Sequence, residues 1–393
     1  MSRIYELMAP AGYFPMLVAA VKAGADAVYF GLNDYSMRAS SKNFSISDLD
    51  EMREISRSGN RDVMLYLTLN TIIYDNEIEK LNEILNQVKD KVDAVICWDH
   101  AVMTQCREIG IPFFISTQAS VANVSAARFY KQLGAQRVVL ARELSLSQIA
   151  PISKEIEVEC FVHGAMCVAI SGRCFMSQFT SEKSANRGEC HQNCRRSYTI
   201  TDSSGNELEL ENSRVMSAKD LCTLHLIPLM KKAGVTSYKI EGRGRDPRYV
   251  DTVTRAYRKA LDEDLTEEEI KELIFELKKV FNRSFSNGFY LGEPSAEDFS
   301  KAENNEATEI KTYIGKIINY YSKPQVASIQ LVADLRIGDE IVIIGNKTGI
   351  ERITVSSMQK EHSEVSSASK GDEIGIQIDN VRRNDEVYLI QQK

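Results

Sequence analysis

Three short stretches decide how this chain folds: Lys22–Phe30 (KAGADAVYF), Gln132–Leu140 (QLGAQRVVL) and Lys232–Ile240 (KAGVTSYKI). In each of them a helical pattern ends at a glycine, and a run of β-branched or aromatic residues follows. Glycine readily takes the left-handed conformation that ends a helix, and a short apolar run after it is typical of a buried strand. The three stretches therefore predict repeated units in which a helix leads directly into a strand of a parallel sheet.

Working outward from these stretches, the sequence predicts eight strands at nearly regular spacing, with an amphipathic helix between most of them. Eight strand–helix units favour an α/β fold closed into a (β/α)8, TIM-like barrel. A doubly wound open sheet is the alternative, and the absence of a GxGxxG motif from the sequence disfavours it. The predicted strands are Tyr5–Pro10, Ala27–Leu32, Val63–Asn70, Ala94–Asp99, Phe113–Gln118, Arg137–Glu143, Val158–Gly164 and Ser237–Arg243.

The regular spacing ends twice along the chain. Residues 165–215 separate the seventh predicted strand from the next helix, far more than the roughly 2–6 residues of an ordinary βα loop. This stretch is a Cys-rich insert at the end of a barrel strand, where barrel enzymes carry their chemistry. From about Ile310 onward, short alternating strands predict a small all-β barrel. We therefore divide the chain into a catalytic barrel at 1–291, a linker at 292–309 and a C-terminal β-barrel at 310–393.

The composition is that of an ordinary globular protein, with 43% hydrophobic and 26% charged residues. The formal net charge is −7, so any anionic partner would have to be held by local clusters of cations. No stretch approaches the roughly 18 uncharged residues of a membrane span, and the first residues lack the apolar core of a signal peptide. We therefore expect a cytoplasmic protein with no membrane partner, in which clustered cysteines bind metal more often than they form disulfides.

Five of the eight cysteines lie in or beside the insert. Thiolates are soft ligands that select zinc or iron–sulfur centres, but the spacing here matches neither a zinc ribbon nor a ferredoxin. The alternative is that cysteines serve as small buried hydrophobes, which we prefer for Cys97, Cys106 and Cys160. The ligand candidates are Cys167, Cys174, Cys190, Cys194 and Cys222.

Strand alternation predicts which side chains line the barrel interior. In the seventh strand, Glu159 and His163 share one face, opposite the apolar face that suits contact with helices. In the eighth strand, Lys239, Glu241 and Arg243 share the inward face by the same logic. For the deeper residues the alternative is a satisfied internal network, such as an ion pair between Glu159 and Lys239.

These polar residues are candidates for distinct roles in one site at the mouth of the barrel. We expect His163, Glu159 and Glu241 to be the catalytic acid–base groups. Guanidinium groups suit carboxylates and phosphates, and the loop after the eighth strand is a common phosphate site, although a solvated basic face is the alternative. The substrate-binding candidates are Arg243, Arg245, Lys239, Gln118, Asn70 and Arg173, and the basic mouth also includes Arg187, Arg195, Arg196 and Arg248.

The segment Glu159–Ser177 (ECFVHGAMCVAISGRCFMS) resembles the signature of the U-thirty-two, or collagenase-like, peptidase family. Phrases along the barrel support the resemblance: ELMAPAG at the start, ANRGEC ending at Cys190, SAKDLC ending at Cys222, KIEGRGRDPRYV, and NRSFSNGF. The C-terminal phrase LRIGDEIVIIGNKTG resembles the second-domain barrel of translational GTPases, which is typical of the branch that forms 5-hydroxyuridine in tRNA.

The resemblance implies a cofactor and partners that spacing alone does not. Members of the family include prephenate-dependent hydroxylases of tRNA or ribosomal RNA and oxygen-independent hydroxylases of ubiquinone synthesis. By motif, a 4Fe-4S cluster would be held by Cys167, Cys174, Cys190 and Cys222, with Cys194 as an alternative ligand because another branch uses a C-x3-C pair. The implied partners are tRNA, a small anionic cosubstrate such as prephenate, and a homologous partner subunit.

The leading hypothesis is therefore an RNA-modifying hydroxylase that acts on the wobble uridine of tRNA. A collagenase-like peptidase is the first alternative, but the sequence contains no HExxH or GxSxG motif, and a Cys167–His163 dyad competes with the ligand role of Cys167. A non-catalytic RNA-binding factor with a structural cluster is the second. Hydroxylation of a quinone precursor is disfavoured, because those relatives are not expected to carry the C-terminal barrel.

Overall fold

The computed structural model describes residues 5–33, 36, 42–196, 198–210, 216–300 and 305–393. Eight parallel strands form a closed ring, because each pairs with the next and β11 pairs with both β7 and β1. The predicted (β/α)8 barrel is confirmed. Its strands are β1 (Glu6–Pro10), β2 (Ala27–Phe30), β3 (Met64–Leu69), β4 (Ala94–Cys97), β5 (Phe113–Ile115), β6 (Arg137–Val139), β7 (Glu157–Gly164) and β11 (Ser237–Ile240).

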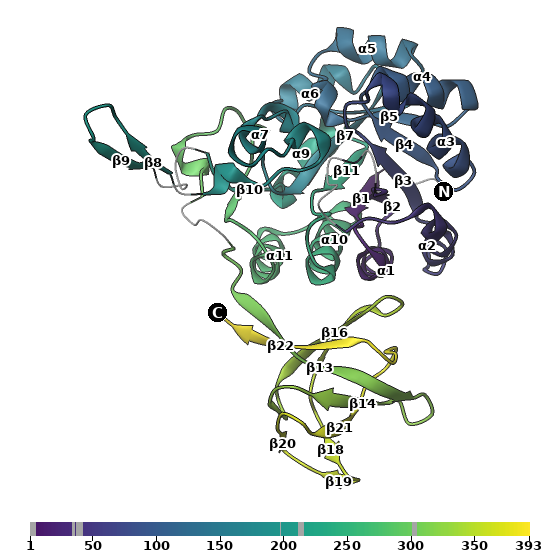
Figure 1. Cartoon of the computed structure of the whole chain (residues 1–393), viewed down its shortest axis with the longest axis vertical. Coiled ribbons are helices and arrows are strands. Elements are labelled where there is room, and N and C mark those ends of the chain that lie inside the picture. Colours follow the sequence, from purple (N-terminus) through teal and green to yellow (C-terminus); the bar gives the residue numbers. More distant parts are fainter. Residues whose placement is uncertain (1–4, 34–35, 37–41, 197, 211–215, 301–304) are drawn as a thin grey trace.

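Helices surround this ring on its outer side (Figure 1). Each presents an apolar stripe to the strands, and together these faces form one large core that encloses the ring. An additional helix, α11 (Glu267–Lys279), follows the last barrel helix. The barrel helices are α1 (Phe14–Lys22), α2 (Leu49–Ser56), α3 (Ile78–Val88), α4 (His100–Ile109), α5 (Val124–Gln132), α6 (Leu146–Ile152), α9 (Ile227–Lys232) and α10 (Pro247–Asp262).

The glycines that end three of the predicted helical patterns are in the left-handed region. The φ angles are +90° at Gly24, +99° at Gly134 and +85° at Gly234. At Gly234 a Cβ atom would also lie 2.3 Å from the Ser153 hydroxyl oxygen, so both the backbone angle and the space require glycine.

The amino-terminal end of the barrel interior is filled by a buried network of charges. Lys239 Nζ lies 2.8 Å from Glu159 Oε1, and Arg137 Nη1 lies 3.3 Å from Glu159 Oε2. Arg137 also pairs with Glu6 and Glu157, the first residues of β1 and β7. The structure therefore confirms the alternative of a satisfied ion pair between Glu159 and Lys239. Glu159 is fully buried and bound by two cations, so it lies within this network and not at the open mouth, and its catalytic role stays a prediction.

The insert adds strands outside the ring instead of leading directly to a helix. Strand β10 (Asp220–Cys222) runs antiparallel to the end of β7 and pairs on its other edge with β12 (Phe285–Ser286). A hairpin of β8 (Tyr198–Thr201) and β9 (Glu207–Leu210) projects away from the barrel (Figure 1). The remaining described elements are the short helix α7 (Met176–Ser181) and three 3-10 turns at Ile170–Gly172, Ala185–Arg187 and Asn193–Arg195.

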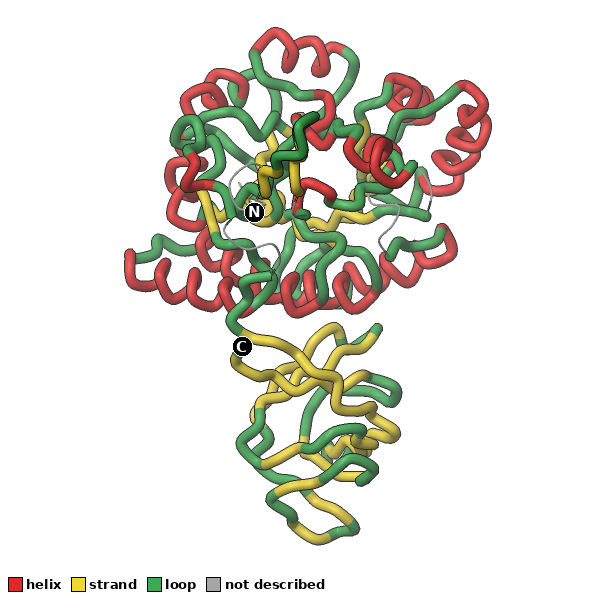
Figure 2. Tube along the Cα trace, turned by 60° about the vertical axis from the view of Figure 1, so that its left-hand side comes forward, coloured by secondary structure: helices red, strands yellow, loops and turns green. Residues whose placement is uncertain are grey.

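The C-terminal part is all β, as predicted, and curls around a second apolar core that is separate from the first (Figure 2). Eight of its strands form one antiparallel sheet in the order β17-β16-β22-β13-β14-β21-β18-β19, and β15 pairs with β20. The strands are β13 (Glu309–Tyr321), β14 (Val326–Leu331), β15 (Leu335–Arg336), β16 (Glu340–Gly345), β17 (Gly349–Thr354), β18 (Gln359–Lys360), β19 (Ser363–Glu364), β20 (Ser367–Ala368), β21 (Glu373–Gln377) and β22 (Glu386–Gln392).

The two parts meet along α1 and α10, which lie on the side of the barrel that faces the C-terminal strands (Figure 1). Gly349 approaches α1 so closely that a Cβ atom would lie 2.7 Å from Val18. Lys22 Nζ lies 2.6 Å from Glu351 Oε1, and Arg248 of α10 forms a buried ion pair with Glu309 of β13. Across the described ranges, the helices are too short or too polar to cross a membrane.

We predict that Glu159→Gln lowers the free energy of unfolding by about 3–5 kcal/mol, because it leaves Arg137 and Lys239 as buried cations without their shared carboxylate. Urea denaturation followed by circular dichroism measures the change. Glu155→Gln is the matched control, since Glu155 pairs with Arg128 at the surface, and its unfolding curve should overlay that of the wild type. Equal unfolding midpoints for the Glu159 variant and the wild type would contradict the prediction.

Candidate functional site

Two of the predicted polar residues meet at the carboxyl end of the ring. Asn70 Nδ2 donates to Ser116 Oγ over 3.4 Å, and the Ser116 hydroxyl donates to Gln118 Oε1. The indole of Trp98 donates to the Asn70 carbonyl over 3.0 Å. Gln118 does not end a strand as predicted, because β5 stops at Ile115 and Gln118 lies in a 3-10 turn. The amide side chains of Asn70 and Gln118 are nevertheless held side by side, as a polar wall of the mouth requires.

Arg243 occupies the neighbouring part of the mouth. Its guanidinium donates to Thr68 Oγ1 over 2.8 Å and to Ser36 Oγ over 2.6 Å. Gly31 is the residue that leaves room for it, since a Cβ there would lie 2.4 Å from Arg243 Nη1. Sequence reasoning predicted Arg243 but missed Ser36, Thr68 and Gly31, because hydroxyls and glycines inside strand patterns carry no distinctive signal.

Glu241 lies between this mouth and the deeper network. Its Oε2 lies 3.3 Å from the Tyr29 hydroxyl, which also donates to the Ile240 carbonyl over 2.9 Å. Lys239 lies one step deeper, with its ammonium 4.4 Å from the centre of the Tyr29 ring. Glu241 is only partly buried, in contrast to the fully buried Glu159.

The insert is anchored across the mouth by arginines. Arg173 Nη2 donates to Ser120 Oγ over 3.0 Å, next to the turn that carries Gln118. Arg187 pairs with Glu77 and donates to the Ile72 carbonyl in the loop after β3. These contacts hold the insert over the carboxyl ends of β3 and β5.

The prediction that seven arginines face one mouth is wrong. Arg195 is buried and donates to Ser217 Oγ and to backbone carbonyls of the insert. Arg248 pairs with Glu309 in the domain junction. Arg245 stacks on Phe281, with its guanidinium carbon 3.4 Å from the ring centre. These guanidiniums have structural partners that a sequence pattern does not reveal.

The prediction that His163 faces the lumen is also wrong. The pairing of β7 with β11 shifts by one residue, so that Lys239 lies opposite Phe161 but Ile240 lies opposite His163. The extra residue in β7 is a β-bulge, which reverses the alternation and turns His163 outward against α10. Its ring lies 5.5 Å from that of Tyr257 and 5.4 Å from that of Phe285.

Its surroundings keep His163 uncharged. Burial, together with the nearby Arg245 guanidinium, lowers the pKa of His163 to about 3. The Nδ1 atom lies 3.4 Å from the Tyr257 hydroxyl, and the side chain is almost fully buried. A neutral histidine enclosed by aromatic rings supports the strand end by packing, and the predicted acid–base role of His163 stays a prediction.

Four of the five candidate cysteines gather in the insert. Burial raises the pKa of the Cys194 thiol, the Arg195 guanidinium lowers it, and the neighbouring thiols of Cys167, Cys190 and Cys174 raise it. The Cys194 thiol therefore lies within electrostatic range of the other three. The segments that carry Cys174 and Cys190 are joined by a hydrogen bond, in which the Asn186 side chain accepts from the Cys174 amide over 3.1 Å. All eight cysteines are free thiols.

Cys222 lies apart from these four. It is paired opposite His163 in the β10–β7 ladder, and its sulfur lies 3.8 Å from the Tyr257 hydroxyl. Burial raises the pKa of its thiol to about 11. The geometry therefore groups Cys194 with the other three thiols, whereas the sequence motif designates Cys222 as the fourth ligand.

Three arginines and one carboxylate form a buried group beside the cysteines. Arg283 Nη1 lies 3.5 Å from Asp220 Oδ1, and Arg245 and Arg195 lie within electrostatic range of the same carboxylate. Burial raises the pKa of Asp220, and burial lowers the pKa of Arg283. The Nε atom of Arg283 is buried without a hydrogen-bond partner. The group carries more positive than negative charge, which suits a neighbour with negative charge.

The chemistry of the donor set fits an iron–sulfur cluster. Four cysteine thiolates are the usual ligands of such a cluster, and four of the candidate cysteines lie in the insert. In the described part of the chain, no three histidine, cysteine or acidic side chains converge closely enough to hold one metal ion. The neighbouring excess of arginine charge also complements the net negative charge of a cluster with four thiolate ligands.

Fold and site together define a class: a (β/α)8 barrel whose mouth is covered by a cysteine-rich insert. The profile of "Peptidase family U32" matches residues 12–300, and the chain belongs to this family. It is 41% identical to a "Collagenase" of Porphyromonas gingivalis, over 99% of this chain and 98% of that protein.

Other relatives have names of a different kind. The chain is 35% identical to the "tRNA hydroxylation protein P1" of Bacillus subtilis, over 86% of this chain and 83% of that protein. It is 33% identical to the "tRNA hydroxylation protein P" of Helicobacter pylori, over 74% of this chain and 72% of that protein. The family thus contains proteins named for proteolysis and proteins named for RNA hydroxylation.

We predict that the thiols of the metal-free protein react with iodoacetamide in two classes at about pH 8. Cys167 is exposed and should react rapidly. Burial raises the pKa of Cys222 to about 11 and the pKa of Cys106 and Cys160 to about 12, so their reactive thiolate is scarce and they should react slowly. Peptide mapping by mass spectrometry over time measures each rate. In denaturant all eight should react alike, and modification of Cys222 as fast as Cys167 in the folded protein would contradict the prediction.

Proposed function

We propose that this protein is an RNA-modifying hydroxylase that forms 5-hydroxyuridine at the wobble position of tRNA, with prephenate as cosubstrate. The observation that carries the proposal is the group of thiols in an insert that is anchored over the mouth of the barrel. Names of relatives support an RNA substrate, because two of the proteins described above are named for tRNA hydroxylation. The proposed partners are tRNA, a small anionic cosubstrate and a homologous partner subunit.

The proposed cofactor is a 4Fe-4S cluster on Cys167, Cys174 and Cys190, with either Cys194 or Cys222 as fourth ligand. Proximity supports Cys194, and the sequence motif supports Cys222. When bound, such a cluster would supply one-electron chemistry at the mouth of the barrel.

The chain's own residues would bind and orient the two substrates. Arg243 and Arg173 present guanidiniums from opposite parts of the mouth, and guanidiniums suit the two carboxylates of prephenate. The amides of Asn70 and Gln118 can donate to and accept from the polar edge of a pyrimidine. Glu241 is the carboxylate within reach of the mouth that would accept a proton from the base. The insert would cover the site and exclude water.

A peptidase is the second candidate, because a relative 41% identical to this chain is named "Collagenase". A Cys167–His163 dyad would need a hydrogen bond between the two side chains. Cys167 is exposed, whereas His163 is buried against Tyr257 and its ring donates to or accepts from that hydroxyl. This geometry supports the hydroxylase over a cysteine peptidase built on that pair.

We predict that protein purified without oxygen contains about four iron and four sulfide per chain. Cys167→Ala, Cys174→Ala and Cys190→Ala should each lose most of the iron. Whichever of Cys194→Ala and Cys222→Ala loses it identifies the fourth ligand. Iron and sulfide analysis with an absorption spectrum measures the content. Cys97→Ala is the control, since Cys97 lies in the apolar core and should keep full iron content. Wild-type protein with no iron, or with one zinc per chain, would refute the cluster.

We predict that a strain without this protein, and without any other protein of the same activity, lacks 5-hydroxyuridine in its tRNA. Nucleoside mass spectrometry of purified tRNA measures it. The wild-type gene should restore the nucleoside, and Arg243→Gln should restore less than about a tenth of it, because one lost charge-assisted contact with a buried substrate costs on the order of 1.5–3 kcal/mol. Lys323→Gln, on an exposed turn of the C-terminal part, should restore it fully. Unchanged nucleoside content in the deletion strain would refute the proposed function.

A further inference from the structure

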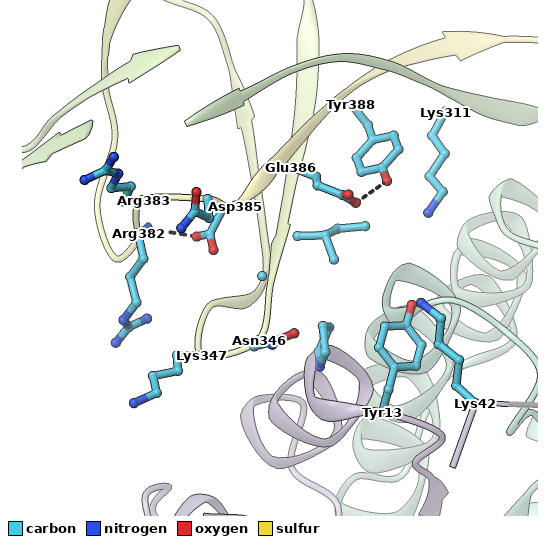
Figure 3. Close-up of a pocket in the computed structure, with 14 residues that line it drawn as sticks. Tyr13, Lys42, Lys311, Asn346, Lys347, Arg382, Arg383, Asp385, Glu386 and Tyr388 are labelled. Atoms are coloured by element: carbon cyan, nitrogen blue, oxygen red, sulfur yellow. Dashed lines mark hydrogen bonds between the residues drawn. The ribbon is translucent and has the colours of Figure 1, made fainter. Parts of the chain in front are cut away.

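A cleft of about 530 Å³ lies at the junction of the two parts of the molecule (Figure 3). Tyr13 and Lys42 line it from loops of the barrel, and the strands and turns of the C-terminal part supply the rest. Tyr13 follows the carboxyl end of β1, and Lys42 lies in the loop after β2. Both loops belong to the end of the barrel at which the proposed site lies, so the cleft opens beside that mouth.

The lining of the cleft is strongly cationic. Its two acidic residues are already engaged: Asp385 accepts from the Arg382 amide over 2.8 Å and from the Thr348 hydroxyl, and Glu386 accepts from the Tyr388 hydroxyl over 2.6 Å. Five basic side chains face these two, which leaves an excess of three positive charges. They are Lys42, Lys311, Lys347, Arg382 and Arg383.

Several of these cations are not used to hold the fold together. Among the interactions of the described residues, Lys347 and Arg383 take part in no ion pair, and both are exposed. The Lys42 ammonium lies 4.3 Å from the centre of the Tyr13 ring. Lys311 forms an ion pair with Asp246, with 2.8 Å between Lys311 Nζ and Asp246 Oδ2. Outside the cleft, the ion pairs Lys22–Glu351 and Arg248–Glu309 connect the barrel to the C-terminal part. The cations of the cleft are therefore not needed for contact between the two parts.

The start of α1 lies in the same cleft. Tyr13 is the residue that precedes this helix, Pro15 lies in its first turn, and both line the cleft. The Met16 and Leu17 amides already donate to the Tyr13 carbonyl, so the cations and not the helix end would bind an anion here. The tyrosine rings of Tyr13 and Tyr388 stand among the cations, with the flat faces on which a base or ribose packs (Figure 3).

We infer that this cleft binds the phosphate backbone of an RNA whose target base enters the barrel mouth. The inference rests on the proposed function, because it names the surface that holds the same substrate. The cations come from four separate segments on two domains and are spaced along the cleft, which suits a chain of phosphates better than one small anion. A chain with a net charge of −7 needs such a local excess to bind RNA at all.

The test is the salt dependence of RNA binding by the full-length protein. Binding of an unmodified tRNA transcript is measured by fluorescence anisotropy between about 50 and 200 mM salt. Because each phosphate contact adds about 0.7–0.9 to the slope of log affinity against log salt, K347Q/R383Q should lower the slope by about 1.4–1.8 and the affinity about tenfold at the low-salt end. The matched control is K323Q/R336Q, which removes two exposed cations of the same domain outside the cleft and should leave the slope unchanged.

Equal slopes for the cleft variant and the wild type, with equal melting temperatures, would overturn the inference. So would saturation of the cleft by inorganic phosphate at concentrations that displace the tRNA, since that result indicates a site for a small anion. The outcome is independent of the hydroxylation assay. If the cleft variant binds tRNA as tightly as the wild type, and deletion of the gene still removes 5-hydroxyuridine, then the RNA-binding role of the cleft is refuted and the proposed reaction is not. If the cleft variant binds tRNA more weakly, and deletion of the gene leaves the nucleoside unchanged, then the proposed reaction is refuted and the binding role is not.

Discussion

Closure of the parallel ring is the constraint on which the rest of the structure depends. Strand β11 pairs with β1 on one side and β7 on the other, so every strand of the ring runs the same way and every carboxyl end lies at one mouth. Residues far apart in sequence meet there for that reason alone: Arg243 reaches Thr68, and Asn70 reaches Ser116. The insert begins at the carboxyl end of β7 and therefore lies over the same end of the barrel.

Two groups of buried charged residues differ in how well their charges are balanced. At the amino-terminal end, Glu159 is matched by Arg137 and Lys239, and that network has no capacity left for a substrate. Beside the insert, Asp220 is outnumbered by arginines, and Arg283 keeps one buried nitrogen without a partner. A matched network stabilises a fold, whereas an unmatched one is suited to a ligand of opposite charge.

The C-terminal part acts through its position. Its close contact with α1 at Gly349 holds the C-terminal strands against the barrel, so that Lys347 and Arg383 line one cleft together with Tyr13 and Lys42. The domain would thereby extend the surface for the proposed RNA substrate without contributing to the barrel core, because the two apolar cores remain separate. A substrate as long as an RNA can use both surfaces at once.

The sequence by itself determined the barrel, the insert, the all-β C-terminal part and the cysteine candidates, because glycine caps, apolar periodicity and thiol clustering are local properties of the chain. Tertiary structure alone decided the orientation of side chains at the strand ends. One bulge between β7 and β11 turned His163 outward, and an ion pair with Glu309 holds Arg248 in the junction between the two parts. Alternation predicts a face only while the pairing register holds, and partners distant in sequence leave no periodic signal. For the same reason the cleft between the two parts could not be predicted: its cations lie on segments that only the packing of one domain against the other brings together.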